Sequence, residues 1–174
     1  IRPTFIKLNL QNGAAVAEMF LQHRITGIIH FAAYKAVGES VQKPVAYYQN
    51  NLGSMLNLLA EVEKAASPIP FIFSSSCTVY GEATKLPITE NSPVQPAMSP
   101  YGNTKQIGEE ILVDTVNAIE GFRVISLRYF NPIGAHPSIA IGELPLGKPQ
   151  NLVPFITQTA AGLYPKLTVF GNDY

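Results

Sequence analysis

The chain has 174 residues, of which 47% are hydrophobic and 14% are charged, so it is long enough to bury a core. Its 12 basic residues balance its 12 acidic residues, which excludes a strong electrostatic attraction to nucleic acid or to an acidic membrane surface. The single cysteine, Cys77, excludes an internal disulfide framework and favours a reducing compartment, so we expect a cytoplasmic protein. The longest apolar runs, such as residues 28–33, are too short to span a bilayer.

Apolar and turn-forming residues divide the chain into alternating strands and helices. The predicted strands are short apolar runs at residues 5–8, 28–33, 71–73, 124–130 and 167–170. The predicted helices have apolar residues at helical spacing and cover residues 14–24, 39–49 (interrupted at Pro44), 52–66, 100–120 and 152–162. Longer loops are expected at residues 81–99 and 132–150.

This alternation predicts an α/β fold, with a Rossmann-like parallel sheet and helices on both faces. Ligands of such folds bind outside the carboxyl ends of the strands. Here those ends carry polar and aromatic residues, at 30–35, 74–78 and 128–131, whereas the strand bodies are apolar. The sequence therefore predicts a functional site at this edge of the sheet.

A tyrosine and a lysine lie four residues apart in the segment SPYGNTK, residues 99–105, after a proline suited to the start of a helix. On a helix, Tyr101 and Lys105 share one face. An ammonium about 4 Å away is worth roughly 4 kcal/mol at an effective dielectric near 20, which would lower a phenol pKa by on the order of 3 units. Tyr101 is therefore a candidate base, and the hydroxyls of residues 74–78 could hold a substrate oxygen against it.

Other interpretations of these motifs are less specific. A Tyr and a Lys at this spacing also occur by chance on helix surfaces, and serine runs are common at strand ends. The segment at 142–149 resembles a P-loop, but Pro149 stands where a magnesium-binding Ser or Thr is needed. The three histidines lack metal-ligand spacing, and His30 is expected to be a buried strand residue, so we predict no metal site.

Several segments together resemble the extended short-chain dehydrogenase/reductase superfamily, and within it the UDP-glucose (UDP-galactose) 4-epimerases. They are HFAAYKAVGESVQKP (30–44), NNL (50–52), SSSCTVYG (74–81), SPYGNTK (99–105), RYFNPIGAHPS (128–138), NLVPF (151–155) and VFGNDY (169–174). The resemblance covers almost the whole chain. It implies interconversion of UDP-galactose and UDP-glucose by hydride transfer through a 4-keto sugar on bound NAD, without net oxidation or reduction.

The resemblance also implies roles for individual residues. The catalytic set would be Ser76, Tyr101 as base and Lys105 as the residue that tunes it. The cofactor-binding set would be Phe31, Ala32, Lys35, Asn50, Ser74, Tyr101, Lys105 and Phe130. The substrate-binding set would be Ser76, Thr78, Tyr101, Asn131, Asn151, Leu152 and Phe170.

A related activity, sugar 4,6-dehydration, needs an Asp-Glu pair near the strand-end threonine. Here Cys77 and Thr78 follow Ser76, so the acid and base of an elimination are missing. An epimerase acting on uronic or N-acetylated nucleotide sugars is a closer alternative, which the sequence leaves open.

The chain is expected to be the central piece of a longer enzyme. It lacks an initiator methionine, a secretory signal and the glycine-rich GxGxxG turn that binds pyrophosphate. We assign residues 1–131 to a NAD-binding domain that lacks its first βα units, and residues 132–174 to the start of a substrate-binding region. The full-length protein is expected to form a homodimer, whereas the piece alone could be non-catalytic.

Overall fold

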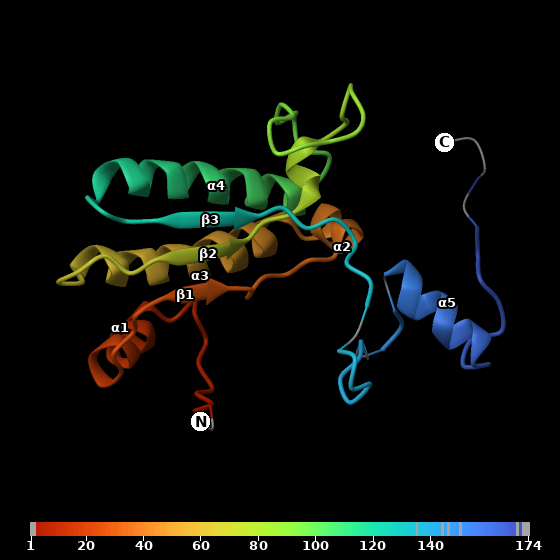
Figure 1. Ribbon diagram of the computed structural model, residues 1–174, viewed down its shortest axis with the longest axis horizontal. Coiled ribbons are helices and arrows are strands. Elements are labelled where there is room, and N and C mark those ends of the chain that lie inside the picture. The colour runs from red at the N-terminus through yellow and green to blue at the C-terminus, as the bar shows by residue number, and fades with distance from the viewer. Residues whose placement is uncertain are drawn as a thin grey trace. The chain divides into compact units, whose positions relative to one another are not determined.

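The computed structural model describes residues 3–134, 136–143, 145, 147–149, 151–169 and 171 (Figure 1). The chain divides into two compact units, Ile1–Phe130 and Asn131–Tyr174. The first unit contains the sheet and four of the five α-helices within the described residues. The assignment of the two parts to cofactor and substrate binding stays a prediction.

The first unit is built on a parallel sheet of three strands in the order β1-β2-β3. The strands are β1 (Ile28–His30), β2 (Phe71–Ser74) and β3 (Val124–Leu127). In the central strand, Phe71 pairs with Ile28 on one side and Val124 on the other. The predicted Rossmann-like parallel sheet is confirmed, and the polar residues that follow β1, β2 and β3 all leave the sheet at the same edge.

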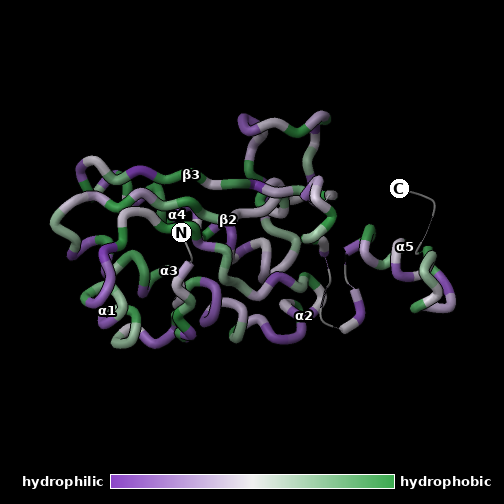
Figure 2. The backbone as a smooth tube through the Cα atoms, turned by 60° about the horizontal axis from the view of Figure 1, so that its bottom comes forward, coloured by the Kyte–Doolittle hydropathy of each residue, from purple (hydrophilic) through white to green (hydrophobic). Residues whose placement is uncertain are grey.

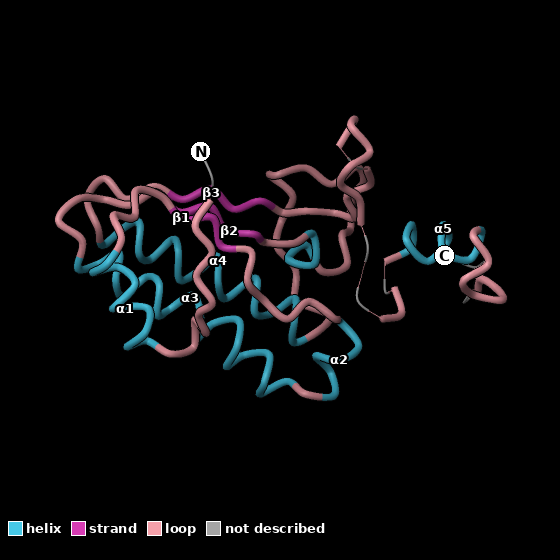
Figure 3. The backbone as a smooth tube through the Cα atoms, turned by 90° about the horizontal axis from the view of Figure 1, so that it is seen from below, coloured by secondary structure: helices cyan, strands magenta, loops and turns pink. Residues whose placement is uncertain are grey.

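Helices connect the strands and cover one face of the sheet. In the first unit they are α1 (Gly13–Gln22), α2 (Val37–Gln42), α3 (Pro44–Lys64) and α4 (Pro100–Ala118), and the second unit contains α5 (Leu152–Ala160). Figure 3 shows α1, α3 and α4 on one side of the strands. On the other face, Ile29 and Ile125 are 61% and 57% exposed. None of the helices within the described ranges combines the length and the apolar character needed to cross a membrane.

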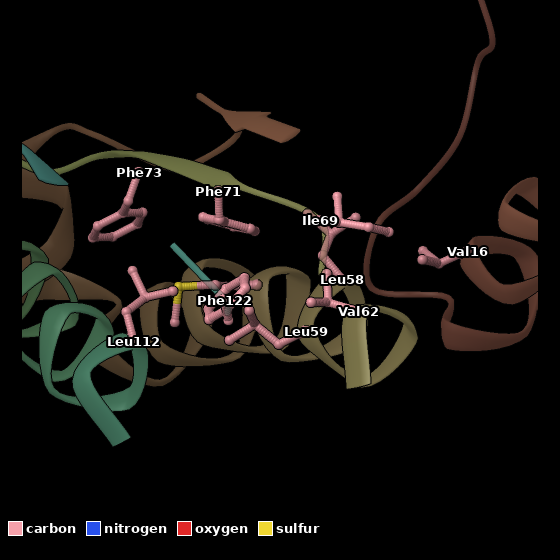
Figure 4. Close-up of a cluster of buried hydrophobic side chains, with 10 residues drawn as sticks. Val16, Leu58, Leu59, Val62, Ile69, Phe71, Phe73, Leu112 and Phe122 are labelled. Carbon is pink, nitrogen blue, oxygen red and sulfur yellow. The ribbon is translucent and has the colours of Figure 1, made fainter. Parts of the chain in front are cut away.

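The core lies between the sheet and helices α1, α3 and α4. Phe71 and Phe73 of β2 pack with Met55 of α3 and Leu112 of α4, and all four are at most 3% exposed (Figure 4). At Gly108 of α4, an added Cβ would lie 2.8 Å from the Phe73 ring. This glycine therefore lets α4 approach β2 closely, which brings the amino-terminal half of α4 to the carboxyl end of the strand.

Two predicted strands are wrong over the residues that the structure describes. Residues 5–8 form no strand, and Phe5 is 88% exposed. Residues 167–169 are also irregular. Both runs are apolar in sequence, but a strand needs a hydrogen-bonded neighbour, and neither run pairs with the sheet. Apolar colouring in Figure 2 continues beyond the strands, so hydropathy alone does not mark them.

Pro44 begins a helix rather than interrupting one. It is at the first turn of α3, where its missing N–H costs nothing, so α3 starts eight residues before the predicted start at residue 52. A short 3₁₀ helix at Cys77–Tyr80, which was not predicted from the sequence, begins directly after Ser76. The Ser76 hydroxyl accepts from the Thr78 N–H at 3.2 Å and caps this turn.

Candidate functional site at the carboxyl edge of the sheet

The start of α4 fixes the position of Tyr101. The hydroxyl of Ser99 caps the helix by accepting from the Gly102 N–H at 3.1 Å, and Pro100 occupies the first helical position. Tyr101 therefore lies in the first turn of α4, and Lys105 follows one turn later on the same face. The predicted start of this helix is confirmed.

The serine run at the end of β2, residues 74–76, lies against this face of α4. The Lys105 ammonium donates to the Ser74 carbonyl at 2.7 Å, and the Ser75 hydroxyl donates to Glu109 Oε1 at 2.5 Å. The Ser76 side chain is close enough to Tyr101 to lower the pKa of its phenol. The structure thus brings Ser76, Tyr101 and Lys105 together, as their places in the sequence predicted, while their catalytic roles stay a prediction.

The pKa of Tyr101 does not move in the predicted direction. Burial raises it above its usual value of 10, and Ser76 offsets only part of this rise. The expected lowering by Lys105 is wrong for the chain alone. The Lys105 ammonium lies 5.7 Å from the centre of the Tyr101 ring and donates its hydrogen bond to the Ser74 carbonyl.

Lys105 is a buried cation. It is 4% exposed, and burial lowers its pKa to about 8. Within the described part of the chain, none of the three ion pairs involves it. Its ammonium lies 4.9 Å from the centre of the Phe73 ring. This cation–π contact offsets part of the cost of burying the charge. An ammonium has three N–H donors, so two are available for other acceptors after the bond to Ser74.

His30 is buried beside this cation, at the end of β1, as predicted. Its ring stacks on Phe73 with 6.2 Å between the ring centres. Burial, and secondarily the Lys105 charge, lower its pKa to about 4. His30 is therefore neutral at neutral pH and adds no charge to the site. Among the residues that the structure describes, no group of three or more His, Cys, Asp or Glu is suited to hold a metal ion.

Thr78 has a polar atom that lacks a partner. Its Oγ1 is buried, and no described group of the protein hydrogen-bonds to it. The residue packs against the first turn of α4, because a Cβ added at Gly102 would lie 3.3 Å from Thr78 Cβ. Leaving a hydroxyl buried and unpaired costs about 1–3 kcal/mol, so Thr78 is suited to hydrogen-bond a ligand oxygen.

The other predicted cofactor residues surround the same edge of the sheet. Phe31, Ala32 and Lys35 follow β1, and all three are exposed. Phe130 follows β3 and stacks on Tyr80 with 6.5 Å between ring centres. Asn50 lies on α3, where its Oδ1 accepts from Gln11 at 2.8 Å.

Asn51 is a site residue that the sequence analysis missed. Its side chain accepts from the Tyr34 N–H at 2.8 Å and donates to the Tyr34 carbonyl at 3.0 Å. It also donates to the Thr104 hydroxyl at 3.1 Å, and Thr104 in turn donates to the Tyr101 carbonyl at 2.7 Å. A buried amide on α3 thus joins the segment after β1 to the helical turn that carries Tyr101. The Tyr47 hydroxyl supports the same segment by accepting from the Ala36 N–H at 3.1 Å.

Replacing Asn51 with alanine is expected to lower the free energy of unfolding by about 2–3 kcal/mol, because several buried groups lose their partners. Exchange of the Tyr34 amide hydrogen should accelerate more than that of core amides. Asn57→Ala is a matched control on the same helix, since Asn57 donates to the Leu10 carbonyl alone at 2.8 Å, and it should cost about 1 kcal/mol. Unfolding in denaturant measures the loss of stability in each variant, and hydrogen exchange measures the change at the Tyr34 amide. Equal losses in the two variants would contradict the role of Asn51 as a clamp.

Glu109 and Arg128 form a second feature that the sequence analysis missed. The Arg128 Nη2 lies 2.7 Å from Glu109 Oε2, and its Nε donates to both carboxylate oxygens at 3.0 and 3.2 Å. The guanidinium also lies 4.9 Å from the centre of the Tyr80 ring. The only signal in the sequence was the four-residue spacing from Lys105 to Glu109.

The remaining predicted substrate residues belong to the second unit. Asn131 is exposed, and Asn151 precedes α5 and donates to Glu143 at 3.0 Å. Leu152 is the first residue of α5 and is 66% exposed. Phe170 lies outside the described residues. The roles of these residues in substrate binding stay predictions.

Comparison with known proteins identifies the family of the chain. Residues 1–173 match the NAD dependent epimerase/dehydratase family. The chain belongs to this family. A UDP-glucose 4-epimerase of Yersinia enterocolitica is 47% identical over 99% of this chain, which covers 51% of that protein. A UDP-glucose 4-epimerase of Cyamopsis tetragonoloba is 51% identical over 98% of the chain, which covers 48% of it.

Solved structures of family members have the same fold. The UDP-glucose 4-epimerase of Stenotrophomonas maltophila, with bound NAD and formylated UDP-arabinopyranose, superposes with a TM-score of 0.90 at 42% identity. That of Bifidobacterium longum, in complex with NAD+ and UDP, gives 0.90 at 44% identity. The two superpositions cover 99% and 97% of this chain, and 51% and 50% of the two epimerase chains. The chain therefore spans about half the length of these epimerases.

Proposed function

We propose that this chain provides the acid–base part of a NAD-dependent UDP-hexose 4-epimerase, which interconverts UDP-galactose and UDP-glucose through a 4-keto sugar. The observation that carries the proposal is the contact of the serine run after β2 with the face of α4 that bears Tyr101 and Lys105. The names and bound ligands of its relatives support the same substrate class.

Groups at the site fit a dinucleotide and a sugar. Lys105 retains two N–H donors and has no carboxylate partner among the described ion pairs, so it suits ribose hydroxyls. Exposed Phe31 and Phe130 offer apolar surface for flat rings, and Lys35 is an exposed cation for phosphate. The unpaired Thr78 hydroxyl suits a sugar oxygen. Bound NAD would accept and return the hydrogen of the sugar C4 as hydride, and its positive charge would favour the phenolate.

Tyr101 would accept the proton of the sugar 4-hydroxyl and later return it. Its pKa is raised in the chain alone, so the phenolate must be stabilised when ligands bind. Ser76 lowers the pKa of Tyr101 and would hold the reacting oxygen. The Lys105 ammonium lies 5.7 Å from the centre of the Tyr101 ring, and its charge also opposes protonation of the nearby His30.

Dehydration of the sugar is not supported by the same site. The residues after Ser76 are Cys77 and Thr78, and neither supplies a carboxylate. The carboxylate closest to the serine run, Glu109, is bound by Arg128 and by Ser75. Epimerisation, which needs one base that takes and returns a proton, matches the groups present.

We also propose that the complete protein works as a homodimer in the cytoplasm. Leu56 on α3 and Val113 on α4 are 48% and 60% exposed, so these two helices have apolar surface that a second copy could cover. The free cysteine fits a reducing compartment. Sedimentation of the complete protein tests the dimer.

The function is tested by incubating the complete protein that contains this chain with UDP-galactose and identifying the products by chromatography and mass spectrometry. UDP-glucose should form, and deuterium placed at C4 of the substrate should be retained in the product. NAD should be released when the protein is denatured. A product lighter by one water would replace the proposal with dehydration. Conversion of uronic or N-acetylated nucleotide sugars alone would keep the reaction and change the substrate.

A further inference from the structure

The serine run after β2 is joined to α4 at three successive points. Tyr101, Lys105 and Glu109 are spaced four residues apart, so they form one row along the helix. Each of the three successive serines lies against a different member of this row. The Ser74 carbonyl accepts a hydrogen bond from Lys105, and the Ser75 hydroxyl donates one to Glu109. The Ser76 side chain is close enough to Tyr101 to lower its pKa.

We propose that Glu109 is a positioning residue, which holds Ser76 against Tyr101 by binding the hydroxyl of Ser75. The inference rests on the proposed function, because it gives the Ser76–Tyr101 pair the role of handling the sugar hydroxyl. Glu109 itself is two helical turns from Tyr101 and is not assigned a contact with substrate.

The carboxylate of Glu109 is itself held in place. Three hydrogen bonds from Arg128 reach its two oxygens, and the Glu109 side chain is 14% exposed. Arg128 follows β3, so the carboxylate connects the ends of β2 and β3 to α4. A carboxylate fixed by a bidentate guanidinium is a rigid acceptor, and the short bond from Ser75 is therefore well defined.

The ion pair also protects the charge of Lys105. Glu109 is one helical turn from Lys105, at a spacing that permits a Glu–Lys pair. Arg128 hydrogen-bonds to both carboxylate oxygens, so the carboxylate is held away from a direct pair with the ammonium. Without Arg128, the carboxylate could turn to Lys105 and neutralise the buried ammonium.

The decisive variant is Ser75→Ala, which removes one hydroxyl and leaves the Glu109–Arg128 pair intact. It should lower kcat about 10-fold through misplacement of Ser76, with KM for the nucleotide sugar within about twofold. The pH at which kcat reaches half its maximum should rise, since Ser76 favours the phenolate. Ser75→Thr, which keeps the hydroxyl, should restore kcat at least in part.

Thr115→Val is the matched control. Thr115 is a buried residue of the same helix, and its hydroxyl donates to the Ile111 carbonyl at 2.7 Å, away from the serine run. This variant should lose a comparable amount of unfolding free energy but keep the wild-type kcat and pH profile. Wild-type kcat and pH profile in Ser75→Ala would overturn the proposal.

A second readout does not depend on activity. With tyrosine labelled at the Cζ carbon, the ionisation of Tyr101 can be followed by NMR in the wild type, Ser75→Ala and Thr115→Val, with Tyr101→Phe to assign the signal. The pKa of Tyr101 should rise further in Ser75→Ala alone. If the wild type fails to interconvert UDP-hexoses yet this shift appears, the proposed function is wrong and the positioning by Glu109 stands. No shift would overturn the positioning whatever the activity.

Discussion

Replacing Tyr101 with phenylalanine is expected to lower the turnover of UDP-galactose by at least about 100-fold, the usual contribution of a general acid–base group. Binding of the nucleotide sugar should change by no more than a few fold, because the ring remains and only the hydroxyl is lost. Tyr101 lies on the lysine-bearing face of α4, close enough to Ser76 for that side chain to lower the pKa of its phenol.

The pH dependence of turnover offers a separate check on this base. A group that works as a phenolate loses its proton as pH rises, so kcat should increase with pH up to the pKa of Tyr101 in the ligand complex. In the chain alone, burial raises that pKa. Ligand binding must therefore lower it, and difference titration with and without NAD should show a lower value with NAD.

Tyr48→Phe is the matched control for Tyr101→Phe. The Tyr48 hydroxyl accepts from Asn103 at 2.7 Å, so its loss also removes a tyrosine contact between α3 and α4. It should leave turnover within about twofold, since the residue is outside the row of Tyr101, Lys105 and Glu109. Turnover near wild type in Tyr101→Phe would show that Tyr101 is not the base.

The local composition of the sequence was enough to predict most of the fold that positions this site. Pro100 after a capping serine marks the start of α4, and apolar runs mark the three strands β1, β2 and β3 of the sheet. Strand length and pairing depend on neighbours that are far away in the chain. For that reason the run at 5–8 resembles a strand in sequence and forms none.

The candidate site was predictable only where its chemistry follows a local pattern. Tyr101 and Lys105 are four residues apart, and the serine run ends a strand, so these groups were found from spacing and position. Asn51 and Arg128 act through partners that are 17 and 19 residues away. Nothing local distinguishes them from a surface amide and a surface cation. The raised pKa of Tyr101 was also unpredictable, because it results from burial that only the packed structure defines.

Lys105→Met is expected to stabilise the fold while it lowers turnover by at least about 100-fold. The pKa of Lys105 falls from 10.5 to about 8 on burial, so holding this side chain charged costs about 3 kcal/mol at neutral pH. Methionine removes that cost but leaves the Ser74 carbonyl without its donor, which costs about 1–2 kcal/mol. The net gain in unfolding free energy should be about 1–2 kcal/mol at pH 7.

The sign of the pH dependence shows whether the buried charge of Lys105 causes the difference in stability between the wild type and Lys105→Met. Between pH 8 and 10.5 the unfolded chain holds the Lys105 proton while the folded chain has lost it. The wild type should therefore gain stability relative to Lys105→Met as pH rises through this window, and the full cost should be present below it. Denaturant unfolding of both proteins across this range measures the difference.

Lys64→Met provides the control for removal of a lysine. Lys64 is on α3 with its side chain 67% exposed and pairs with Glu61, so its replacement should change the unfolding free energy by less than about 0.5 kcal/mol. Lower stability in Lys105→Met at pH 7 would mean that the hydrogen bond to Ser74 and the contact with the Phe73 ring outweigh the burial of the charge. The stabilised and inactive variant expected here would show that the protein keeps a costly buried cation for its chemistry.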